Sequence, residues 1–224
     1  MSEDFSVKEF IDAKTGLAYR IYKYKRGDCR RVLLNSRLCG QLAGYSLIEK
    51  DLRSVRIWLD EIDARHTDRP TRNGEIHGRS TDRANYNLIK GLFVAALTFY
   101  GKCFSKCEGR PVKLERVQVD ARFHNLHDEC IAYRHNFAAH SGAKKLEHVE
   151  IALVSPAKHK DKVHFKLYRE LAQPDLFWSM PGEVALVELV EHARSIAMAK
   201  IELLTKKIQD EEVLPNAAKY WGTR

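Results

Sequence analysis

One short stretch of the chain, residues 131–142 (IAYRHNFAAHSG), brings together side chains suited to phosphate chemistry. Arg134 is permanently charged, can bind two phosphate oxygens at once and can stabilise charge that develops at phosphorus. A histidine side chain has a pKa of about 6.5, so His140 can accept or donate a proton near neutral pH. Asn136 lies four residues before His140, on the same face of a helix, where it can orient His140 or a substrate hydroxyl. The pattern predicts a catalytic site for an anionic substrate, with His135 as a further candidate.

The spacing within this stretch bears on how many chains form the site. Arg134 and His140 are six residues apart, which places them roughly 120° apart around an ideal helix. They therefore flank a groove, or they act together with residues of a second chain. Ala138 and Ala139 are small enough to let another helix approach closely. A twofold dimer would bring two copies of the arginine and the histidine together, so we expect a homodimer.

Two other interpretations of the same region remain open. An arginine and a histidine at a helix end can cap carbonyl groups and pair with acids such as Asp128 and Glu129. Alternatively, His124 and His127 are three residues apart and, with Asp128 nearby, have the side chains that hold a cation. The sequence offers no two further ligands at a suitable spacing. We therefore predict neither a metal nor another cofactor.

The N-terminal 35 residues are expected to form a basic arm. Residues 17–25 (LAYRIYKYK) alternate in part and predict a short strand or an extended segment. Between residues 20 and 37, seven Lys and Arg side chains are accompanied by Asp28 as the only acid. Within this segment, Arg26, Arg30 and Arg31 are candidates for contacts with an RNA backbone, the alternative being an ordinary solvated surface.

The elements that must position these residues are predominantly helical. Apolar residues recur at steps of three and four along several segments, whereas an alternating pattern on both sides of SPAKHKD predicts a β-hairpin with a basic tip. The segment 65–82 has no apolar period and predicts an exposed loop. We expect one domain over residues 1–224, a mainly α bundle of about four long helices with one inserted hairpin. The predicted helices are 36–64, 81–107, 113–140 and 179–212, and the predicted hairpin is 147–170.

Composition limits the class of protein. The chain is 44% hydrophobic and 30% charged, as expected for a globular protein. Its formal net charge of +8 favours a polyanionic partner such as nucleic acid. The N-terminal residues lack the apolar region of a signal peptide, and the apolar stretch 91–101 is too short to span a bilayer. Together with five cysteines, an odd number, this predicts a cytoplasmic protein with free thiols and no membrane association.

The stretch RHNFAAH, residues 134–140, resembles the signature of the HEPN superfamily. In that signature an arginine, usually followed by a polar residue, precedes a histidine by four to six positions. Here five residues separate Arg134 from His140, and His135 is the polar residue. The abortive-infection and toxin-like members are the most similar, because YRHNFAAHSG is followed by a predicted β segment.

This resemblance implies a function as well as a fold. It implies a helical bundle, usually dimeric, with a metal-independent endoribonuclease site built from the Arg and His of both chains. Cleavage would proceed by attack of the RNA 2′-hydroxyl, in phage defence or in a toxin–antitoxin pair with an antitoxin protein as partner. The alternative is a non-catalytic HEPN-like dimer that binds RNA, nucleotide or a partner protein. Gly142 replaces the tyrosine of the branch that is silenced by nucleotide addition, so we do not expect that regulation.

Overall fold

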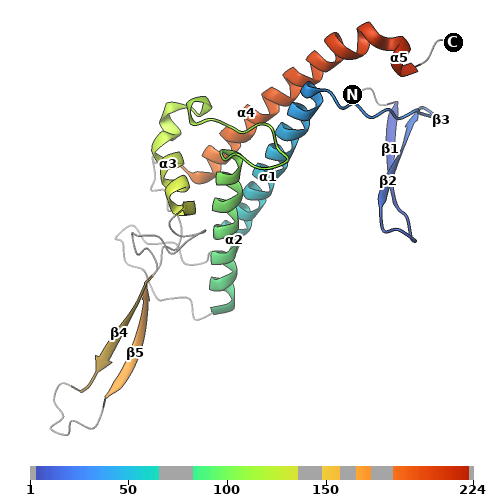
Figure 1. Ribbon diagram of the computed structural model, residues 1–224. Coiled ribbons are helices and arrows are strands. Elements are labelled where there is room, and N and C mark those ends of the chain that lie inside the picture. The colour runs from blue at the N-terminus through green and yellow to red at the C-terminus, as the bar shows by residue number, and fades with distance from the viewer. Residues whose placement is uncertain (1–3, 66–82, 136–147, 157–164, 173–183, 222–224) are drawn as a thin grey trace.

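The computed structural model describes residues 4–65, 83–135, 148–156, 165–172 and 184–221, and within these the chain is mainly helical (Figure 1). Three long helices dominate: α1 (Arg37–Arg65), α2 (Arg83–Cys103) and α4 (Leu186–Lys207). A shorter helix, α3 (His124–Tyr133), precedes Arg134. The segment after α4 continues through a π-helical turn (Ile208–Val213) and a 3₁₀ turn (Leu214–Asn216) into α5 (Ala217–Trp221).

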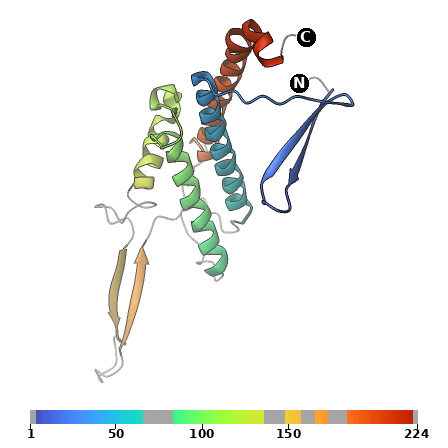
Figure 2. The same ribbon diagram turned by 45° about the vertical axis from the view of Figure 1, so that its right-hand side comes forward.

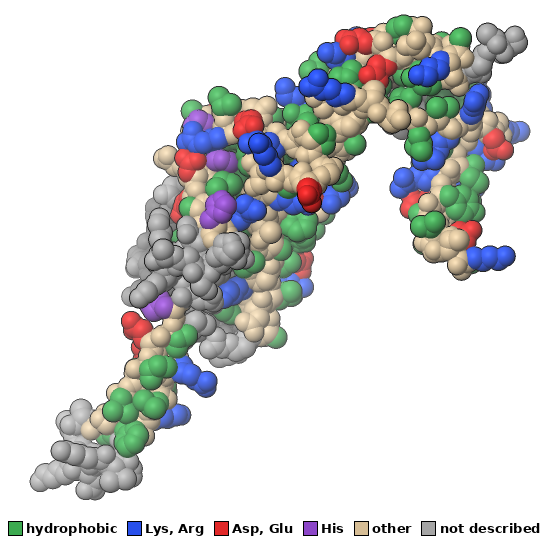
Figure 3. All heavy atoms as spheres, viewed as in Figure 1, with side chains coloured by type: hydrophobic (Ala, Val, Ile, Leu, Met, Phe, Trp, Pro, Cys, Tyr) green, Lys and Arg blue, Asp and Glu red, His purple; other side chains and the backbone are tan. Residues whose placement is uncertain are grey.

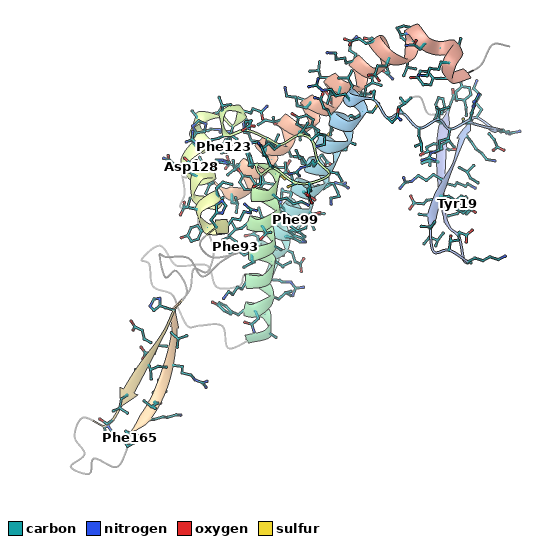
Figure 4. The ribbon with its side chains drawn as sticks, viewed as in Figure 1. Tyr19, Phe93, Phe99, Phe123, Asp128 and Phe165 are labelled. Atoms are coloured by element: carbon teal, nitrogen blue, oxygen red, sulfur yellow. The ribbon has the colours of Figure 1, made fainter. Side chains whose placement is uncertain are left out.

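The core lies where α1 packs along both α2 and α4, with α3 against α2. Its side chains are those that the apolar stripes of the sequence place on one face of each helix. From α1, Ile48 and Leu52 are fully buried, and Phe93 of α2 lies in the same cluster. In Figure 4, Phe93 is labelled on α2 and Phe123 beside α3. The other large buried side chains of the cluster are Val55, Leu97, Tyr100, Leu114, Phe123, Leu189 and Val190.

The first predicted helix is confirmed almost to the residue, but the second and third were predicted too long. The helix α2 ends at Cys103 and does not reach residue 107. The chain turns there around Gly109, whose φ is +72°, and Arg110 folds back to donate to the carbonyl oxygens of Lys102 and Ser105 at the helix end. These contacts give the carbonyl groups at the helix end a further, charged donor.

Among the described residues of the predicted helix 113–140, the α-helix covers His124–Tyr133. Two 3₁₀ turns, η1 (Arg116–Gln118) and η2 (Ala121–Phe123), come first, and α3 begins at His124. Glu115 and Gln118 form a capping box around η1, and Asp120 accepts a hydrogen bond from the Arg122 amide at 3.0 Å. Such local side-chain hydrogen bonds compete with a continuous helix. Residues 134 and 135 continue α3 as a π-helical turn, and residues 136–140 lie outside the described ranges.

The C-terminal helix also differs from its predicted bounds of 179–212. Residues 184 and 185 are not helical, and Ala185 is extended at the N-cap, so α4 begins at Leu186. The predicted start at Ser179 and Pro181 lies outside the described residues. At the other end helical turns run on to Val213, but with π-helical rather than α-helical geometry from Ile208.

Two small antiparallel sheets complete the fold. The predicted hairpin at 147–170 is confirmed as β4 (His148–Val154) paired with β5 (Lys166–Ala172). The predicted extended segment at 17–25 is β2 (Ala18–Tyr24), which pairs with β1 (Phe5–Ile11) and with the two-residue β3 (Gly27–Asp28). The sequence did not predict β1. With it, residues 5–28 of the expected basic arm form a three-stranded sheet. Both sheets project from the helices in different directions, as Figures 1 and 2 show.

None of the described helices is long and apolar enough to cross a membrane. All five cysteines are free, in agreement with the expected thiols. Cys103 and Cys130 are buried, and burial raises the pKa of the Cys103 thiol to about 12. Both therefore behave as small core residues rather than as nucleophiles.

Candidate functional site

Arg134 lies at the end of α3 with its side chain laid across the C-terminal end of α2. Its Nη1 donates a hydrogen bond to Ser105 Oγ at 3.3 Å, and Ser105 Oγ in turn donates to the Gly101 carbonyl at 2.8 Å. The aliphatic part of the arginine passes directly over Gly101, where a Cβ atom would overlap Arg134 Cδ. The Ser105 hydroxyl thus binds the guanidinium, and the absence of a side chain at Gly101 leaves room for the rest of Arg134, which stays partly exposed.

Two contacts that the sequence allowed for this arginine are not made. Asp128 is bound instead by Arg116, whose Nε and Nη2 lie 2.7 Å from its two carboxylate oxygens. The hydrogen bond from Arg116 lowers the pKa of Asp128, so the carboxylate is ionised and already paired at neutral pH. Within the described ranges, Arg134 has no carboxylate at ion-pair distance.

The other predicted site residues lie beside Arg134 in sequence, and one of them is described. His135 is exposed next to Arg134 in the π-helical turn. Asn136 and His140 lie outside the described residues, so their placement relative to Arg134 stays a prediction.

The two histidines of α3 are within hydrogen-bond distance of neighbouring residues of the chain. His127 is buried, and its Nδ1 is 2.8 Å from the hydroxyl of Tyr100. Burial lowers the pKa of His127 and raises that of Tyr100, so a protonated hydroxyl can donate to a neutral ring. His124 Nε2 lies 2.9 Å from the Val119 carbonyl. Among the described residues, no group of three or more His, Cys, Asp or Glu is placed to hold a metal ion.

A buried charge cluster that the sequence did not reveal supports the same end of α2. Asp51 of α1 is 1% exposed, and Lys50 Nζ and Lys102 Nζ lie 2.8 and 3.0 Å from its carboxylate oxygens. Arg110 Nη1 is 3.8 Å from Asp51 Oδ2. These are charge contacts rather than aligned hydrogen bonds, because neither Asp51 oxygen has a well-oriented donor among the described residues.

This cluster is linked to the candidate site through Arg110. Its Nη2 donates to the Ser105 carbonyl at 3.3 Å, and the Ser105 side chain holds Arg134. Gly101, Ser105, Arg110 and Asp51 are thus the supporting residues that sequence reasoning missed. Only Gly109 and Pro111 signalled a turn there, and no spacing rule connects Asp51 to a turn about sixty residues later.

The three candidate RNA-binding arginines are exposed. Arg26 lies in the turn between β2 and β3, and Arg30 and Arg31 follow β3. None of the three has an ion pair among the residues described. Figures 1 and 2 show the N-terminal sheet and the end of α3 on different sides of the helices, so one chain does not bring these arginines to Arg134.

The chain matches no protein-family model, and no curated protein or solved structure matches it. Evidence for a function therefore comes from the motif at residues 134–140 and from the surroundings of Arg134.

Proposed function

We propose that this chain is a metal-independent endoribonuclease of the HEPN type. The observation that carries the proposal is the guanidinium of Arg134, fixed by Gly101 and Ser105 at the end of α3 and free of any described carboxylate. A cation held in this way is suited to a phosphate group, because it need not first break an ion pair. The resemblance of RHNFAAH to the HEPN signature supplies the rest of the argument.

In the proposed reaction, the RNA 2′-oxygen attacks the adjacent phosphorus and the bond from phosphorus to the 5′-oxygen breaks. The products are a 2′,3′-cyclic phosphate and a 5′-hydroxyl. Arg134 binds the non-bridging oxygens and offsets the charge that develops on them. His140 transfers a proton, either from the 2′-hydroxyl or to the leaving 5′-oxygen. His135 and Asn136 are proposed to orient the substrate, and no cofactor takes part.

The first test is cleavage of labelled RNA in the presence of EDTA. We expect products that end in 2′,3′-cyclic phosphate, and a loss of about 100-fold or more in rate for Arg134→Ala and for His140→Ala. Arg122→Ala is a matched control, because this arginine of the same region stacks on Phe123 and should leave cleavage unchanged. Tight RNA binding without cleavage by the unaltered protein would contradict the enzyme and favour the non-catalytic HEPN-like dimer.

We further propose that the active unit is a homodimer with residues 131–142 of each chain at the twofold axis. Of Arg134 and His140, only the histidine can transfer a proton near neutral pH. The reaction uses both an acid and a base, so the pair in one chain is one group short. Close approach of two such segments is favoured by the small side chains of Ala138 and Ala139. The biological setting, phage defence or a cytoplasmic toxin with an antitoxin partner, is proposed from the resemblance alone.

Bulk at the proposed axis should separate the chains. We expect Ala138→Trp to give monomers that no longer cleave RNA, with mass measured by light scattering and cleavage measured as above. Ala64→Trp adds the same bulk at an exposed position of α1 outside that segment and should leave both mass and cleavage unchanged. A folded, monomeric and fully active Ala138→Trp protein would show that the site is not shared between chains.

A further inference from the structure

One face of the β1–β2 ribbon carries a stacked aromatic pair. Phe10 and Tyr19 are directly opposite each other across the two strands, with ring centroids 5.4 Å apart and planes inclined by 18°. The rings are 41% and 50% exposed. The next two pairs on the same face are Lys8 with Ile21 and Ser6 with Lys23, so basic side chains continue the aromatic surface.

None of the described helices covers this face. Every residue of β1 is exposed and none of β2 is buried, and Figure 4 shows Tyr19 on a ribbon that stands away from the helices. A cross-strand aromatic pair contributes only about 0.2–1 kcal/mol to the stability of a sheet, which is a small return for two rings that remain this exposed. Large exposed apolar side chains gathered on one face are more typical of a binding surface.

The charge of the sheet favours an anionic ligand. Residues 4–31 contain eight Lys and Arg and four Asp and Glu side chains. Three of the four acids have partners within the sheet: Glu9 pairs with Arg20 at 2.8 Å, Asp28 with Lys23 at 3.4 Å, and Asp12 accepts from two backbone amides. By contrast, Lys8, Arg26, Arg30 and Arg31 have no ion pair among the described residues.

The second hairpin is a useful contrast within the same molecule. One face of β4–β5 carries Val149, Ile151 and Leu153 of β4 together with Leu167 and Arg169 of β5. Figure 3 shows these hydrophobic side chains gathered on the hairpin. Tyr168 lies opposite Ala152 and Phe165 precedes β5, so the described residues of this hairpin form no cross-strand aromatic pair like that of Phe10 and Tyr19.

We propose that the Phe10–Tyr19 face binds single-stranded RNA. Bases stack on the outer faces of the two rings, and Lys8 together with the arginines beyond Tyr24 contacts the phosphates. Five residues at about 3.3 Å each put Tyr24 about 17 Å from Tyr19, a length that a short single strand spans. A duplex is excluded from this mode because its base faces are already stacked on each other. The surface extends the proposed ribonuclease function by holding the substrate away from the cleavage site.

The test uses a labelled oligouridine of about 15 nucleotides with 2′-O-methyl groups, which cannot be cleaved by 2′-hydroxyl attack. Binding is measured by fluorescence anisotropy. Phe10→Leu with Tyr19→Leu should weaken binding about 10-fold or more, because stacking on each ring is lost. The matched control is Phe5→Leu with Tyr24→Leu, which removes the aromatic pair of the opposite face, 4.7 Å between centroids, and should change binding less than about twofold. Replacing Arg30 and Arg31 with Ala should weaken binding of all sequences alike and flatten its dependence on salt.

Several results would overturn the inference: no binding of the probe, equal losses for the two aromatic pairs, or equal competition by double-stranded RNA. Self-association that is lost on Phe10→Leu with Tyr19→Leu, without RNA binding, would assign the face to a second copy instead. Far-UV circular dichroism confirms that each variant retains its fold. A protein that binds the probe but cleaves no RNA would keep this inference and reject the nuclease, so the two failures are distinguishable.

Discussion

Asp51→Ala is expected to lower the free energy of unfolding by about 3–5 kcal/mol, a large share of the stability of a domain. The change removes the only carboxylate within ion-pair distance of Arg110 among the described residues, and the Arg110 side chain is 4% exposed. A buried guanidinium without a counter-charge carries a large desolvation cost. Urea unfolding followed by circular dichroism gives the measurement.

A matched control and a double variant separate burial from charge. Asp60→Ala removes an exposed carboxylate from the same helix, where it pairs with Arg56, and should have a far smaller effect. Combining Asp51→Ala with Arg110→Met removes both charges, so the double variant should be less destabilised than the sum of the single variants. Additive losses, or a single loss below about 1 kcal/mol, would mean that the charges of the cluster are not coupled.

Gly101→Ala is expected to reduce RNA cleavage by about 100-fold while leaving stability almost unchanged. The added methyl group would occupy the space of Arg134 Cδ, so the guanidinium must leave the Ser105 hydroxyl. In a helix, alanine is favoured over glycine by about 1 kcal/mol, which offsets the cost of moving a flexible side chain. Rate at saturating RNA and thermal unfolding are the two measurements.

The same helix supplies the control for this prediction. A Cβ at Gly91 of α2 would meet no atom within 4 Å, so Gly91→Ala should leave cleavage unchanged and raise stability slightly. Full activity of the Gly101→Ala protein would show that cleavage does not depend on the observed position of Arg134. Loss of activity together with a large loss of stability would show that Gly101 serves packing rather than the site.

How far the sequence predicts the fold can be followed along α1 and α2. Apolar residues at steps of three and four fixed the bounds of α1 to within one residue, because one buried stripe runs its whole length. The end of α2 was placed four residues too late, because the contacts that end it come from Arg110, which folds back onto the helix. Periodicity carries no information about such tertiary capping.

For the sheets and the candidate site, too, local sequence patterns predicted some features and missed those that depend on tertiary contacts. Alternation predicted β4 and β5, but β1 was not predicted because the alternation of apolar and polar residues in its sequence, FSVKEFI, breaks at Glu9 and Phe10. Residue types alone identified Arg134 as a candidate phosphate ligand. The residues that hold it, Gly101 in α2 and Ser105 just beyond the end of that helix, have no chemical signature in the sequence, since both residue types occur at such positions for other reasons.

The helix α4, which packs along α1, is synthesised long after it. The two helices are joined across their interface by Glu49–Arg194 at 2.9 Å and Arg56–Glu191 at 3.2 Å, yet α4 begins about 120 residues after α1 ends. A ribosome therefore releases α1, α2 and the Arg134 segment before the helix that completes their core. If the chain cleaves RNA, the nascent polypeptide carries the site on helices whose core is still incomplete until α4 emerges, and we expect this to delay cleavage of its own messenger.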